Sequence, residues 1–231
     1  MDINLELNER EVERRERIVP EIIIYQVTEI KIHFEENIQL LKNQFQIADE
    51  LVNNGKASDA ETIWRTQVVL LASAFDYFMH EVVWLGLYQM FKGQRTKSDK
   101  YNKLTVTMKE LEDFASDPED EEWFKHYITS LYKSATMMSF GDVKRYLAMV
   151  DISITNVANG AFYQVGGTVK TIKQLEEKLN RIYYRRNSIA HQSDRAHEDA
   201  TQKPITKELV EEFVENVNKI VTAIIDEMSI A

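Results

Sequence analysis

The stretch VVLLASAFDYFMHEVVWLGLYQMF, residues 68–91, decides the fold class of this chain. It is apolar on nearly every side of a helical projection, which is typical of a helix buried at the centre of a bundle. Asp76, His80 and Glu81 interrupt it, and ionisable side chains are costly inside a bilayer. We therefore expect a core helix rather than a membrane span. Residues 58–61, Ser-Asp-Ala-Glu, predict a capping box at its start.

The segments on either side are also helical in pattern. Apolar residues at three- and four-residue steps predict a long helix from Pro20 to about residue 52, and another over residues 206–228. A third amphipathic helix is expected from about residue 170 to 191. Shorter helices are expected over 106–115, from Asp117-Pro118 to 134, and over 140–150 with Ser139 as its cap. Residues 151–169 are expected to form a long connection or a small hairpin. The sequence thus predicts an all-α fold, an antiparallel helical bundle.

Composition narrows the class of protein further. Among 231 residues there are only 7 glycines and 3 prolines, too few turn formers for a many-stranded sheet. The absence of cysteine excludes disulfides, zinc–thiolate sites and thiol chemistry, and favours an intracellular, cytoplasmic location. Residues 1–6 carry neither a basic nor an apolar signal-peptide region, so no targeting segment is expected. We divide the chain into an N-terminal helical extension, residues 1–55, and a helical domain, residues 56–231.

Charge is distributed unevenly along the chain. The net charge of −10 disfavours general nucleic-acid binding, which depends on neutralising phosphates. Residues 170–195, however, contain seven basic and three acidic residues. This local positive surplus could hold a phosphate while the rest of the surface repels non-specific polyanions.

The same region ends in the segment YRRNSIAH, residues 184–191. Arg186 lies in the apolar register of its helix, where an arginine needs a partner. Asn187 and His191 are four residues apart and share a helical face. An arginine offers a planar cationic fork for phosphate, and a histidine can take and return a proton near neutral pH. The segment therefore predicts cleavage of an RNA phosphodiester without a metal or cofactor. Because one chain supplies one such histidine, we expect a two-fold homodimer with a composite site.

Arg186-Asn187-Ser188-Ile189-Ala190-His191 resembles the R-x(4–6)-H signature of the HEPN superfamily, the metal-independent ribonucleases of prokaryotic defence and toxin systems. Residues 65–81 are similar to the first core helix of its RiboL-PSP-HEPN family. The resemblance extends over about residues 60–225. It implies a helical homodimer that cleaves RNA to a 2′,3′-cyclic phosphate, acts as a toxin or anti-phage effector, and works with an antitoxin or defence-system partner. It also implies that Arg186 and His191 are the catalytic pair, with Asn187 beside them.

Several alternatives remain open at the level of sequence. Arg185 also fits the signature spacing, so either arginine could face phosphate, or both could simply balance the helix dipole. Asp76 and His80, four residues apart, could orient Arg186 or could form a buried packing pair. His191, Asp194 and His197 have a spacing that could bind a metal, although we assign no metal and count Asp194 as a supporting residue. A non-catalytic helical dimer, serving as adaptor or RNA-binding module, and a metal-dependent hydrolase are the competing functions.

Overall fold

The computed structural model of this protein describes residues 21–165 and 170–230, and every regular element in these two ranges is a helix. The all-α prediction is therefore confirmed. The helices are α1 (Val27–Asn53), α2 (Ala57–Phe91), η1 (Tyr101–Lys103), α3 (Met108–Ser116), α4 (Glu122–Tyr132), α5 (Phe140–Leu147), α6 (Ile154–Phe162), α7 (Thr171–Gln192) and α8 (Lys207–Ile230).

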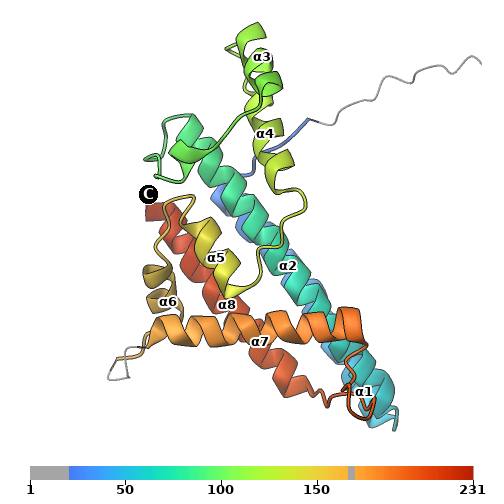
Figure 1. The fold of residues 1–231 in the computed structure, drawn as a ribbon. Coiled ribbons are helices and arrows are strands. Elements are labelled where there is room, and N and C mark those ends of the chain that lie inside the picture. Colours follow the sequence, from blue (N-terminus) through green and yellow to red (C-terminus); the bar gives the residue numbers. More distant parts are fainter. Residues whose placement is uncertain (1–20, 166–169, 231) are drawn as a thin grey trace, which may run out of the picture.

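The centre of the fold is α2, as its apolar sequence predicts. It runs antiparallel to α1, and it also packs against α7 and α8 (Figure 1). By length and composition alone α2 could cross a membrane, but 61 % of its most apolar window is buried inside the bundle. Five α1 side chains, from Ile30 to Phe45, lie in the same core. The helix α1 thus packs as part of the bundle, while a domain boundary at residue 55 stays a prediction.

Helix α7 positions the candidate site. Figure 1 shows it lying across α8, with its carboxyl-terminal end at the amino-terminal half of α2, where Asp194 bonds to Arg65. Leu175, Leu179 and Ile182 form its buried stripe. The apolar period therefore fixes which side of α7 faces the core.

The structure corrects several predicted boundaries. Helix α1 was expected to begin at Pro20 but begins at Val27. At this start, the Glu29 carboxylate accepts a hydrogen bond from the Gln26 backbone N–H at 2.8 Å. Helix α2 begins at Ala57, and the capping box predicted at residues 58–61 does not form. Asp117 accepts a bond from the Glu119 N–H in a turn, so that α4 begins only at Glu122.

A whole helix was missed in the sequence. Residues 154–162 form α6, not a connection or hairpin, with Ser153 as the side-chain cap. Glycine is common in loops, but Gly160 lies where α6 approaches α8: a Cβ atom there would lie 3.0 Å from the Ala223 Cβ. The glycine permits close helix packing rather than a turn. The predicted cap of α5 is confirmed, since Ser139 Oγ accepts from the Asp142 N–H.

Candidate active site

The carboxyl-terminal end of α7 turns sharply into the loop that leads to α8. Ser193 and Asp194 both adopt the left-handed conformation, with φ of 52° and 57°. The Asp194 N–H donates to the Ser188 carbonyl at 2.9 Å, which closes the end of the helix. The loop then folds back on itself, so that the Lys203 N–H donates to the Asp194 carbonyl at 2.8 Å. The reversal brings Lys203 back to the last turn of α7.

The core residues of the predicted site lie together. Arg186, Asn187 and His191 line one surface pocket of about 530 Å³, with Lys203 from the loop and Thr136 from the α4–α5 connection. Arg186 Nη1 donates to the Asn187 Oδ1 at 3.0 Å, which restrains a guanidinium without neutralising it. His191 is exposed to solvent. The pocket therefore combines a phosphate-binding fork with a proton carrier.

Arg185 is placed differently from its neighbour. Its Nη2 donates to the buried Asp194 carboxylate at 2.6 Å and to the Pro204 carbonyl at 2.9 Å. Burial lowers the pKa of Arg185, and the Asp194 charge opposes that shift. The side chain lies outside the pocket lining, with its charge already balanced. Arg185 thus holds the loop against α7.

Asp194 is fully buried at the junction of α2, α7 and the loop. Its Oδ2 accepts from Arg65 Nε at 3.0 Å as well as from Arg185. We call Arg65, Arg185 and Asp194 the arginine–aspartate cluster. Because its carboxylate points into this cluster, Asp194 cannot join His191 and His197 in a ligand set. In the described residues no group of three or more His, Asp or Glu side chains is arranged to hold a metal ion.

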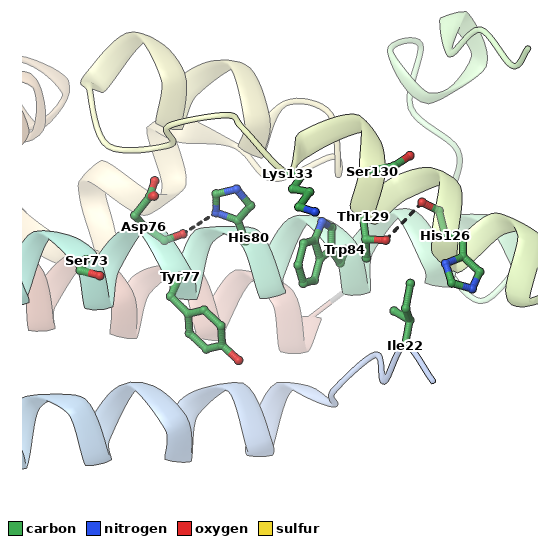
Figure 2. A pocket seen from close by; sticks show the side chains of 10 residues that line it. All are labelled: Ile22, Ser73, Asp76, Tyr77, His80, Trp84, His126, Thr129, Ser130 and Lys133. Atoms are coloured by element: carbon green, nitrogen blue, oxygen red, sulfur yellow. Dashed lines mark hydrogen bonds between the residues drawn. The ribbon is translucent and has the colours of Figure 1, made fainter. Parts of the chain in front are cut away.

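Asp76 and His80 line a different pocket, of about 650 Å³, between α2 and α4 (Figure 2). The two His80 ring nitrogens lie 2.8 Å from the Asp76 carbonyl and 3.1 Å from the Tyr132 carbonyl. Asp76 Oδ1 accepts from the Met137 N–H at 2.6 Å. Neither side chain contacts Arg186 by a hydrogen bond or ion pair in the described structure. Both side chains instead bond to the chain on either side of Thr136, at the Tyr132 carbonyl and the Met137 N–H.

In the folded structure, carboxylates neutralise several of the basic residues that give residues 170–195 their positive charge. Lys178 and Arg181 both bind the Glu212 carboxylate of α8 at 2.7 Å, and the bonds from these two side chains lower the pKa of Glu212. Arg185 is paired with Asp194. Among the cations of the pocket lining, Arg186 and Lys203 form no ion pair with a described carboxylate.

Sequence reasoning missed Lys203, Thr136 and Tyr184 as lining residues. Tyr184 was visible as part of the segment, and its 66 % exposure marks it as an aromatic side chain outside the core. Lys203 and Thr136 carry no signal in the sequence, because tertiary contacts bring their loops to α7.

With this geometry established, comparison with known proteins gives the class. The family model described as RiboL-PSP-HEPN matches residues 29–229. The chain therefore belongs to the RiboL-PSP-HEPN family, as the resemblance predicted, and the match also includes most of α1. Curated proteins and solved structures gave no significant match.

Proposed function

We propose that this protein is a metal-independent endoribonuclease whose active site is the Arg186–His191 pocket. The observation that carries the proposal is the pairing of Arg186 with neutral Asn187 in the same pocket as exposed His191, while Arg185 is neutralised by Asp194. Membership of a HEPN family supports an RNA-related role.

The proposed reaction is an internal transesterification. A histidine removes the proton of the ribose 2′-hydroxyl, and the 2′-oxygen then attacks the adjacent phosphorus. The bond from phosphorus to the 5′-oxygen breaks, and a second histidine protonates that oxygen. The products are a 2′,3′-cyclic phosphate and a 5′-hydroxyl end, and no water is consumed. Arg186 stabilises the extra negative charge on the pentavalent phosphorus.

The chemistry needs two proton carriers, and His191 is the histidine among the described residues that line the pocket. A two-fold homodimer would bring the second copy of His191 to the same phosphate. We propose this dimer as the active species, with its seam at the end of α7. A cytoplasmic role as a toxin or anti-phage effector, held by an antitoxin or defence-system partner, fits such an activity.

The test is RNA cleavage in excess chelator. His191→Ala should lower the rate by about 10²–10⁴-fold, the usual contribution of a general acid or base. His197→Ala is the matched control, since His197 is also exposed but lies outside the pocket lining. Circular dichroism should show the same helicity in both variants. Equal loss in the two variants, or undiminished cleavage by His191→Ala, would reject the assignment.

A non-catalytic helical dimer is the second candidate, favoured by the net charge of −10, which suits protein contacts better than capture of free RNA. It predicts no cleavage by the wild-type protein at any concentration. The nuclease instead predicts an activity per chain that rises with protein concentration as the dimer forms. Product ends distinguish the two further, because only the nuclease generates cyclic phosphate.

A further inference from the structure

Lys203 enters the candidate site from outside the sequence signature. It is half-buried, and its Nζ donates to the Oγ of Ser188, another residue of the pocket lining, at 3.0 Å. A lysine ammonium has three N–H donors, so this bond to a neutral hydroxyl leaves two donors and the full charge for a ligand. The side chain lines the same pocket as His191.

The backbone of Lys203 is held from both sides by the arginine–aspartate cluster. Its N–H donates to the Asp194 carbonyl at 2.8 Å. Its carbonyl accepts from Arg65 Nη2 at 2.9 Å and from Arg185 Nη2 at 3.3 Å. Three charged residues on α2, α7 and the loop therefore converge on one residue. Because folding fixes this backbone, a ligand does not have to order it on binding.

We propose that Lys203 is a phosphate-binding residue of this site and that Arg65, Arg185 and Asp194 position it. The proposal rests on the proposed function, since it assumes that RNA enters the pocket. Arg186 and Lys203 have complementary chemistry: the arginine is a planar fork, and the lysine is a compact point charge. Together they place two cations around one phosphate, where negative charge grows during transesterification.

A need to position Lys203 also explains why the charged side chains of the arginine–aspartate cluster are buried. Arg65 and Asp194 are buried, although connecting segments usually run over the protein surface. A buried ion cluster is weak evidence for stability, because the cost of desolvation offsets much of the attraction. It is better explained by precise placement of the one lysine whose backbone it contacts.

The test measures binding rather than cleavage. In a His191→Ala background, which should leave RNA intact, the affinity for a fluorescent single-stranded RNA is measured from low to physiological salt. Loss of one phosphate contact lowers the slope of log affinity against log salt by about 0.7 for single strands. Lys203→Met should show this loss, and Lys203→Arg should restore most of the slope. Lys173→Met is the matched control, because Lys173 is an exposed lysine of α7 outside the pocket lining.

The outcomes separate the two proposals. If Arg186→Ala reduces the slope but Lys203→Met matches the Lys173→Met control, Lys203 is not a phosphate ligand and the nuclease proposal stands. If the His191→Ala protein binds no RNA even at low salt, both proposals fall.

The positioning role has its own readout. Asp194→Asn should weaken RNA binding when Lys203 is present and have little further effect in the Lys203→Met background. Additive effects of the two substitutions would reject the positioning role. Unchanged helicity is required of every variant compared.

Discussion

Replacement of Asp194 by alanine tests the role of the arginine–aspartate cluster in holding the end of α7. Asp194 is completely buried, and its Oδ2 accepts hydrogen bonds from Arg65 and Arg185. The two arginine side chains are only 9 % and 15 % exposed. Alanine would therefore leave two cations together in a region with little access to water, and repulsion would add to the loss of both bonds.

The magnitude follows from these contacts. Hydrogen bonds to charged groups contribute about 1.5–3 kcal/mol each, and breaking a buried ion pair costs about 3–5 kcal/mol. Two features reduce the loss. Glu61 still binds Arg65 at 3.2 Å, and the buried Asp194 Oδ1 has no protein partner, so its removal recovers some desolvation energy. We expect a net loss of about 2–4 kcal/mol.

Urea unfolding followed by circular dichroism at 222 nm (a wavelength that reports helix) measures this loss. In thermal unfolding, each kcal/mol lost should lower the melting temperature by about 2–4 °C in a chain of this size. Asp199→Ala is the matched control. Asp199 is an exposed aspartate of the same loop, bonded to Thr201, and its replacement should leave the unfolding midpoint close to that of the wild type. A loss below about 1 kcal/mol for Asp194→Ala would contradict a cluster that stabilises the loop.

Two further predictions concern the core. A Cβ atom at Gly86 would lie 2.6 Å from the Val150 Cβ, so Gly86→Ala should destabilise the protein by at least about 1–3 kcal/mol. Gly141→Ala, with its nearest neighbour at 3.8 Å in a helix, should instead be neutral or stabilising, and equal effects in urea unfolding would refute this contrast. Burial raises the pKa of Glu81 above its ordinary value, so the folded state holds this proton more tightly than the unfolded chain. The Glu81 contribution to stability should then fall as pH rises from the ordinary glutamate pKa through the raised one, and Glu81→Gln should gain stability relative to wild type over the same rise in pH. A difference that does not change with pH would contradict the assignment.

Much of this fold could be predicted because local periodicity reflects burial. The apolar sequence of residues 68–91 predicts a helix surrounded by others, and α2 is the most buried helix of the bundle. The stripe of Leu175, Leu179 and Ile182 likewise predicts the orientation of α7. Arg186, Asn187 and His191 were predicted to lie together because helical spacing alone brings them together.

Features that depend on distant partners could not be predicted. Gly160 is typical of a loop in the sequence, and only the close packing of α6 against Ala223 of α8 explains a glycine inside a helix there. The start of α4 depends on which of several acidic residues turns the chain first. Asp76 and Arg186 line different pockets, because α2 and α7 place them apart in the fold, and no local sequence pattern reports this.

The choice between Arg185 and Arg186 shows this limit most clearly. Both satisfy the spacing of the sequence signature, and each residue of a helix is rotated by about 100° from the last, so neighbours face different surroundings. What distinguishes them is Asp194, which follows the helix in a left-handed turn and accepts a hydrogen bond from Arg185 but not from Arg186. The Asp194 carboxylate balances the charge of Arg185, and that arginine, together with the Asp194 backbone carbonyl, holds the backbone of Lys203. A charge-conserving exchange, Arg185→Lys, should therefore disturb Lys203 and the loop, whereas Arg186→Lys should disturb only the pocket, because the compact ammonium of a lysine cannot reproduce the reach and planar geometry of a guanidinium.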